Sequence, residues 1–118
     1  MKLKKNAQIR NFLTLKVKDA QCDLYFPENI DDVVRFTSEF NDFYVLSGGS
    51  NVIAGKLKKP VLFMGNMIGT SQTEDVSEYA VKTFMPAGVR ISDLINYSIK
   101  NGLSGVEFMA GIPGTLGG

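Results

Sequence analysis

The residues of this chain best suited to chemistry lie in two glycine-rich segments. The first reads Ser47-Gly48-Gly49-Ser50-Asn51 and directly follows an apolar run at residues 43–46. Two adjacent glycines allow successive backbone N–H groups to turn toward one point and surround an anion, and the serine and asparagine side chains add further donors. The same residue types are also standard in plain turns. By itself, this segment leaves a plain turn and an anion-binding loop both open.

The second segment ends the sequence as Gly111-Ile112-Pro113-Gly114-Thr115-Leu116-Gly117-Gly118. It holds four glycines and no charge, and such a run neither packs a core nor forms a regular helix or strand interior. Its bare N–H groups and its freedom in φ suit close approach to a phosphate. Two such loops in one small chain can grip the two ends of a diphosphate, so together they favour nucleotide binding.

Neither segment matches a familiar nucleotide-binding motif. The stretch from Gly49 to Gly55 has one residue too many for a Walker loop, and Lys56 is followed by Leu57 where a serine or threonine should hold magnesium. In the terminal segment the glycines are three residues apart, unlike those of the Rossmann fingerprint, and Pro113 imposes different backbone constraints. Any nucleotide is therefore bound in another way.

The composition limits the classes of protein and of site. With 118 residues, 44% hydrophobic and 21% charged, the chain is typical of one soluble globular domain. No apolar run approaches the ~20 residues that span a bilayer, and the lysine-rich start is not followed by the apolar stretch of a secretory signal. Cys22 is the single cysteine and histidine is absent, which excludes an internal disulfide and nucleophile–histidine catalysis and argues against a zinc site. An intracellular location is the default expectation.

The positive charges are concentrated at the start of the chain, although the net charge is only +1. The cations that precede the first acid, Asp19, are Lys2, Lys4, Lys5, Arg10, Lys16 and Lys18. They fit a nucleic-acid-binding arm or, alternatively, a solvated terminus followed by a strand with outward lysines. Because aromatic residues do not interleave with these cations apart from Phe12, nucleic acid is the less favoured partner.

Hydrophobic spacing predicts the elements that position the first loop. Residues 1–11 are expected to be a polar lead-in. Strands are predicted at 14–18, at 22–26, at 43–46 and, beyond the loop, at 52–54. Asn29 is suited to cap a helix whose buried face is expected to hold Ile30, Val33, Val34, Thr37 and Phe40.

A second set of elements is predicted to lead to the terminal loop. A strand at 61–64 is followed by a polar, turn-rich stretch at 65–75 and by a strand at 79–85. A helix is expected over 92–100, with Asn101 and Gly102 as its C-terminal stop. Its inner face is expected to hold Ile91, Leu94, Ile95, Ser98 and Ile99. No repeat or interdomain linker interrupts this order.

The two loops, the intervening Pro86-Ala87-Gly88 and the whole block at 105–118 resemble the UDP-N-acetylenolpyruvoylglucosamine reductase (MurB) family. Order and spacing match from about residue 11 to residue 118, and the terminal block is the most specific part. The resemblance implies an α+β (α/β-like) fold, with a small mixed sheet and two flanking helices. This fold would be the N-terminal part of an FAD-binding domain of the PCMH/vanillyl-alcohol-oxidase type. Its N-terminal subdomain would span about 11–64, and a second would start within about 75–118.

The resemblance also implies which residues bind FAD. The candidate cofactor-binding residues are Ser47, Gly48, Gly49, Ser50, Asn51, Ala87, Gly88, Gly111, Ile112, Pro113, Gly114 and Thr115. Residues 47–51 would wrap the diphosphate, and residues 111–115 would form the second wall of the cofactor cleft. The sequence departs from the family pattern at 17–20, 54–60 and 65–75, so local contacts there are expected to differ.

No residue of this chain matches the family's catalytic serine or cysteine, its glutamate and arginine, or its NADPH and substrate contacts. Glu107 fits a solvated or paired carboxylate. We therefore expect the N-terminal part of a cytoplasmic, peptidoglycan-precursor reductase. The full-length enzyme would use FAD and NADPH on a UDP-sugar, without a membrane or a metal, and this piece would be inactive alone. The alternatives are a non-catalytic nucleotide- or FAD-binding module and a small, basic-tailed nucleic-acid binder.

Overall fold

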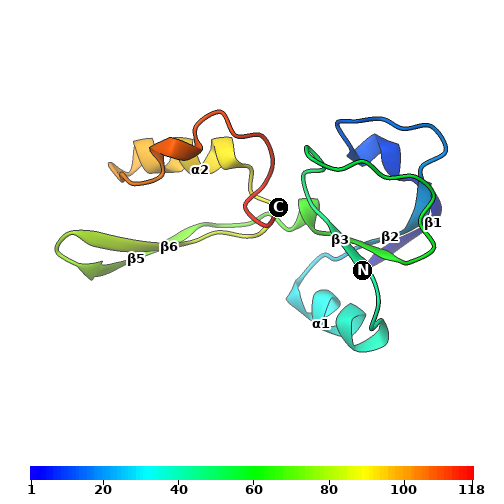
Figure 1. Cartoon of the computed structure of the whole chain (residues 1–118). Coiled ribbons are helices and arrows are strands. Elements are labelled where there is room, and N and C mark those ends of the chain that lie inside the picture. Colours follow the sequence, from blue (N-terminus) through cyan, green and yellow to red (C-terminus); the bar gives the residue numbers. More distant parts are fainter.

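The computed structural model describes residues 1–118 and divides them into two lobes, joined near the C-terminus (Figure 1). The first lobe holds four strands, β1 (Lys2–Gln8), β2 (Gln21–Phe26), β3 (Tyr44–Leu46) and β4 (Val61–Phe63), with the helix α1 (Ile30–Glu39). The second lobe holds the hairpin β5 (Gln72–Ser77) and β6 (Ala80–Phe84) and the helix α2 (Ile91–Lys100). Short 3₁₀ turns complete the chain at η1 (Ile9–Phe12), η2 (Met64–Asn66) and η3 (Glu107–Met109).

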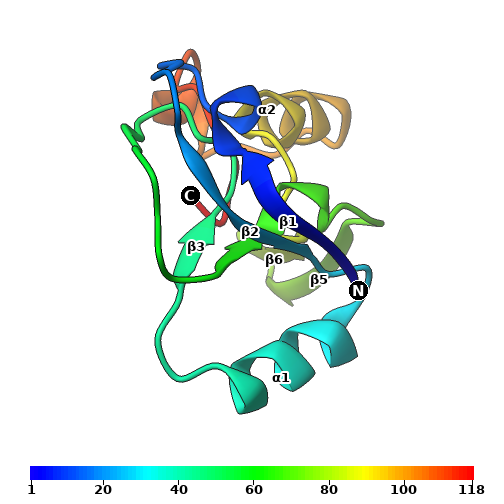
Figure 2. The same ribbon diagram turned by 90° about the vertical axis from the view of Figure 1, so that its right-hand side faces the viewer.

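The first lobe is built on a mixed sheet with strand order β1-β2-β4-β3. β1 and β2 are antiparallel, whereas β4 is parallel to both β2 and β3. One face of the sheet carries the main core, a cluster of ten buried residues. α1 lies at one end of the first lobe, beside the sheet (Figure 2). The ring of its Phe36 packs against the ring of Tyr25 in β2, with the ring centres 4.9 Å apart.

The strands predicted at 22–26 and 61–64 are confirmed by β2 and β4. Residues of β2 alternate between half-buried and buried, with Cys22, Leu24 and Phe26 in the core. All three residues of β4 are buried, as expected for a central strand that is covered on both faces. These strands form the rigid base that carries the first loop.

The start of the chain differs from the prediction. The polar lead-in is the strand β1, which lies at an edge of the sheet and pairs with β2. The predicted strand at 14–18 is irregular, because no neighbouring strand pairs with it and Thr14 N–H instead donates to the carbonyl of Gly49 at 3.1 Å. The lysines of β1 are exposed, and charged side chains on an edge strand protect it from pairing with other chains.

The region around the first loop is also less regular than predicted. The strand at 43–46 shortens to β3, and only Leu46 is buried, since Tyr44 and Val45 lie on the outer edge of the sheet. The strand predicted at 52–54 does not form. The residues directly after the loop therefore run along the first lobe without regular secondary structure.

The helix α1 begins as predicted, with the Asn29 side chain accepting a hydrogen bond from Asp32 N–H at 2.9 Å. Its predicted buried face is partly wrong. Ile30 is 66% exposed and Val34 61% exposed, whereas Phe36 is fully buried. The rings of Phe36, Phe40 and Phe43 pack together with Tyr25 beneath the helix, so Ile30 and Val34 remain in solvent.

The second lobe follows the predicted order, with one difference. Part of the stretch predicted to be turns forms β5, which pairs antiparallel with β6. The predicted strand and helix are confirmed by β6 and α2, and Gly102 ends α2 with a positive φ of 64°. Ile91 and Ser98 are buried as expected, but Ile99 is 72% exposed.

The α+β character is confirmed, although the strands form two sheets and each lobe has one helix. None of the helices combines the length and the apolar character needed to cross a membrane. The two lobes meet where the terminal loop reaches the end of β3 (Figure 1). This meeting point contains the candidate site.

Candidate functional site

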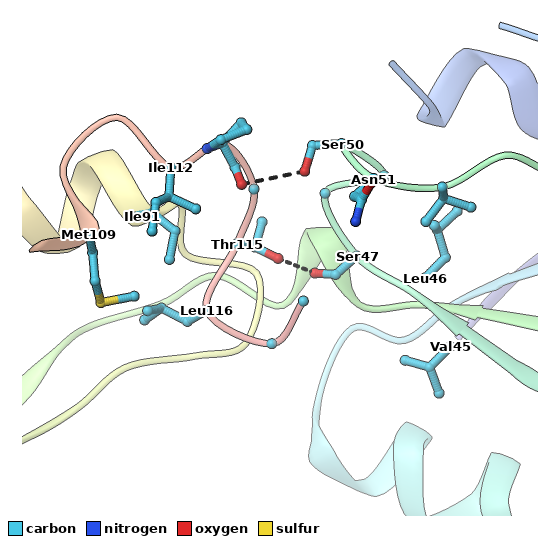
Figure 3. Close-up of a pocket in the computed structure, with 17 residues that line it drawn as sticks. Val45, Leu46, Ser47, Ser50, Asn51, Ile91, Met109, Ile112, Thr115 and Leu116 are labelled. Carbon is cyan, nitrogen blue, oxygen red and sulfur yellow. Dashed lines mark hydrogen bonds between the residues drawn. The ribbon is translucent and has the colours of Figure 1, made fainter. Parts of the chain in front are cut away.

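The two glycine-rich segments lie on either side of one pocket of about 560 Å³ (Figure 3). We call residues 47–51 the first loop and residues 111–118 the terminal loop. The pocket is lined by all of the first loop, by residues 112–118 of the terminal loop, and by Val45, Leu46, Val52, Ile91 and Met109. The fold thus brings together the two segments that the sequence singled out.

The first loop is held by close contact with the first lobe. Gly49 has a φ of +62°, and a Cβ added there would lie 2.1 Å from the carbonyl oxygen of Phe12. Its own carbonyl accepts the N–H of Thr14. No side chain fits at this position, so glycine is required for the loop to follow this path.

The terminal loop is held by the second lobe through strand-like bonds to the segment before α2. Ile91 N–H donates to Gly114 at 3.1 Å, and Leu116 N–H donates to Val89 at 2.9 Å. Gly117 N–H donates to the carbonyl of Ala87, also at 2.9 Å. The loop is therefore anchored to the start of α2, which carries it into the space between the lobes.

The two loops contact each other directly. The buried hydroxyls of Ser47 and Thr115 form a hydrogen bond, and Ser50 Oγ donates to the Pro113 carbonyl at 3.4 Å (Figure 3). A Cβ added to Gly48 would lie 3.1 Å from the Cα of Gly114. The two loops therefore approach so closely that a side chain at Gly48 would crowd the backbone of the opposite loop.

The pocket offers many free hydrogen-bond donors and no charged side chain. None of the N–H groups of residues 47–51, of Gly114 or of Thr115 donates a hydrogen bond within the chain. No lysine, arginine or acid lines the pocket. Ser47, Gly49 and Thr115 are buried, and buried N–H groups need partners. Several free N–H groups around one concavity form a site that favours an anion.

The ionisable groups with shifted pKa values lie outside this pocket. Arg90 hydrogen-bonds Asp93 through two nitrogens at 2.9 and 3.0 Å, which lowers the pKa of the Asp93 carboxyl, but both side chains are exposed. Burial raises the pKa of the Cys22 thiol to about 11, inside the first lobe. The arrangement in the pocket therefore suits binding rather than proton transfer.

A second pocket of about 290 Å³, lined by residues of hydrophobic types, adjoins the first. The two share Val45, Leu46 and Val52, and the apolar one continues to Tyr44 and Ile53 along the outer edge of β3. A ligand with a polar group and a flat apolar end can therefore place the polar group at residues 47–51 and the apolar end along β3.

The predicted site residues fall into two groups. Residues 47–51 and 112–115 line the pocket, whereas Ala87, Gly88 and Gly111 do not. Gly88 packs against η2, where a Cβ would lie 2.8 Å from three carbonyl oxygens, and its N–H donates to Met67. Ala87 and Gly88 thus support the terminal loop from behind.

Sequence reasoning did not include several lining residues. Leu116, Gly117 and Gly118 belong to the same glycine-rich block, so its composition already marked them. Val45, Val52, Ile91 and Met109 have ordinary apolar types, and only the fold brings them to the pocket. No motif in the sequence distinguishes them from core residues.

No protein-family model matches the chain. Among curated proteins, it is 34% identical over 120 residues to the UDP-N-acetylenolpyruvoylglucosamine reductase of Legionella pneumophila (strain Corby), across 96% of this chain and 37% of that protein. It is 26% identical over 115 residues to the reductase of the same name from Borrelia garinii subsp. bavariensis, across 92% of this chain and 36% of that protein.

The fold points to the same proteins. The crystal structure of UDP-N-acetylenolpyruvylglucosamine reductase (MurB) from Thermus caldophilus superposes with a TM-score of 0.72 and 26% identity, covering 100% of this chain and 41% of that one. The chain thus spans little more than a third of the length of the curated relatives that it matches. In sequence and in fold, the chain is similar to the N-terminal part of the UDP-N-acetylenolpyruvoylglucosamine reductases.

Proposed function

We propose that this chain is the FAD-binding part of a UDP-N-acetylenolpyruvoylglucosamine reductase, and that the pocket between the lobes holds the diphosphate of the cofactor. The observation that carries the proposal is the set of free N–H groups that two separate glycine-rich loops bring to one pocket. In this proposal, the N-terminal subdomain comprises about residues 11–64, and the second begins within about 75–118.

The residues present fit such a cofactor. A diphosphate needs several converging donors, and the first loop supplies them without side chains that would obstruct it. The adjoining apolar pocket along β3 offers a surface for a flat ring. Because the pocket carries no charged side chain, backbone N–H groups and hydroxyls are the groups of this chain that would hold the anion.

Each predicted residue then has a distinct role. Residues 47–51 bind the diphosphate through backbone N–H groups, the Asn51 side chain adds donors, and the Ser50 hydroxyl adds one when it turns from the Pro113 carbonyl to the ligand. Gly114 and Thr115 supply N–H groups from the opposite wall, beside Ile112 and Pro113. Ala87 and Gly88 keep the terminal loop in place, and Gly111 provides its turn with a φ of +83°.

The chemistry that bound FAD would supply is hydride transfer from NADPH to the enolpyruvyl double bond of the UDP-sugar. The residues of this chain bind the cofactor and orient it. NADPH and the UDP-sugar are proposed to bind the longer, cytoplasmic enzyme, where the proton-donating groups also lie. We expect no turnover from the 118-residue chain by itself.

The proposal is tested by titrating the purified chain with FAD and following the flavin fluorescence. ADP should compete with FAD, whereas riboflavin, which lacks the diphosphate, should not. Gly48→Ala places a Cβ 3.1 Å from Gly114 and should lower the affinity about tenfold or more. Gly55→Ala is the matched control, since nothing lies within 4 Å of its added Cβ.

Three results would count against the proposal. One is competition by riboflavin without competition by ADP, which would place the recognition at the flavin ring instead of the diphosphate. Another is an unchanged affinity in Gly48→Ala, which would remove the glycine loop from the site. The third is retention of the chain on nucleic acid, sensitive to salt and without flavin binding, which would favour the lysines of β1 as the functional surface.

A further inference from the structure

We propose that the hydroxyls of Ser47 and Thr115 form a latch that sets the separation of the two loops. Both residues then act as positioning residues, and their side chains do not bind the ligand. The latch itself follows from the geometry of the chain. Only its consequence for the cofactor rests on the function proposed above.

The latch joins two parts of the chain that are 68 residues apart. Ser47 directly follows β3 in the first lobe, and Thr115 is paired with Arg90 ahead of α2 in the second. The two residues are 7% and 9% exposed, and neither hydroxyl makes any other hydrogen bond. It is the only buried hydrogen bond between side chains in the chain.

Few other contacts hold the lobes together. The bond from Ser50 to Pro113 is exposed and longer. The backbones of Gly48 and Gly114 pack against each other, but such van der Waals contact lacks the directional geometry of a hydrogen bond. The remaining links lie at η2, which continues the chain from β4 and packs against Gly88, whose N–H donates to the carbonyl of Met67 at 2.8 Å. These links lie behind the terminal loop and not between the two walls of the pocket. A buried, directional bond is therefore the element that can fix the distance between the two walls of the pocket.

The chemistry of the pair predicts how it responds to substitution. Removing one hydroxyl leaves the other buried without a partner, which adds a desolvation cost to the lost bond. Removing both hydroxyls also removes that cost. Ser47→Ala and Thr115→Val should therefore be non-additive, and the double variant should be no worse than either single one. Thr115→Ser keeps the hydroxyl and should restore the latch.

The separation of the lobes can be measured without any ligand. Nitroxide labels at Glu39→Cys in α1 and Asn96→Cys in α2 report the distance between the lobes by pulsed electron paramagnetic resonance. Cys22 is only 3% exposed and stays unlabelled. We expect a narrow distance distribution in the otherwise unsubstituted chain and in Thr115→Ser, and a broad one in Ser47→Ala, in Thr115→Val and in the double variant. Thr37→Val, which removes an exposed hydroxyl of α1, is the control.

A broad distribution before substitution, or an unchanged narrow one in both single variants, would overturn the latch. In a parallel titration, each single variant should lose about five- to tenfold in FAD affinity, and the double variant no more. If the distances respond as expected and the chain binds no FAD, the proposed function fails while the latch stands. If FAD binds and its affinity is the same in every variant, the latch has no part in positioning the site.

Discussion

The two lobes differ in how well they are packed, and the difference shows which of them determines the site. Of the thirteen buried hydrophobic residues, all except Ile91 belong to the first lobe. The second lobe leaves Tyr79, Ile99 and Phe108 between 72% and 90% exposed. The first lobe is thus built around a core of its own, and the second is a hairpin and a helix with little between them.

This difference assigns separate tasks to the two loops. The first loop is fixed by a packed sheet and by the backbone of Phe12, so its donors are preorganised. The terminal loop is fixed only to the start of α2 and to the first loop. We infer that the first lobe supplies a rigid half of the pocket and that contact between the loops places the other half.

The largest effect is expected from the cores. Leu24→Ala, at a fully buried position of β2, should lower the free energy of unfolding by about 3 kcal/mol, through lost burial and the cavity left behind. Leu94→Ala, at a half-buried position of α2, should cost about 1 kcal/mol. Urea denaturation measures both. Equal losses would mean that the second lobe has a core comparable to the first.

A smaller difference in the free energy of unfolding is expected between alanine substitutions of a glycine in each loop. Gly49→Ala should cost about 2 kcal/mol, because a Cβ meets the Phe12 backbone and the φ of +62° is strained for alanine. Gly114→Ala is also strained, at a φ of +118°, but its Cβ would meet only the movable Ser50 hydroxyl at 3.1 Å and no backbone. It should cost less than Gly49→Ala, about 1 kcal/mol from backbone strain, by the same measurement. The reverse order would make the terminal loop the more rigid one.

The smallest effect compares the starts of the two helices. Asn29→Ala removes the side-chain cap of α1 and should cost about 1 kcal/mol. α2 has no side-chain cap at Arg90, and the exposed Asp93 is the only partner of the Arg90 side chain. Arg90→Ala should therefore leave the urea midpoint unchanged. A loss in Arg90→Ala that matches the loss in Asn29→Ala would show that the surface pair holds α2 in place.

Sequence patterns predicted the elements that carry their own local signals. Asn29 with Asp32 marks the start of α1, alternation marks β2, and Gly102 marks the end of α2. The first loop and the terminal loop were likewise visible as glycine-rich runs. In each case the residues concerned interact with neighbours in sequence, so spacing alone is informative.

The incorrect predictions concern contacts between distant residues. Residues 14–18 alternate like a strand but have no strand beside them, whereas the lysine-rich start pairs with β2 and becomes β1. Ile30 and Val34 share a helical face with Phe40, yet the ring of Phe36 occupies the space below the helix. The bond between Ser47 and Thr115 has no sequence signal at all, because it depends on how the lobes meet.

The claim that both loops form one diphosphate site is tested most directly by nuclear magnetic resonance of the ¹⁵N-labelled chain during titration with ADP. We expect the amide signals of residues 47–51 to shift together with those of Gly114 and Thr115, with one common dissociation constant. The signals of Gly55 and Gly102 should stay in place. Shifts confined to one loop, or shifts spread over the lysines of β1, would contradict the account.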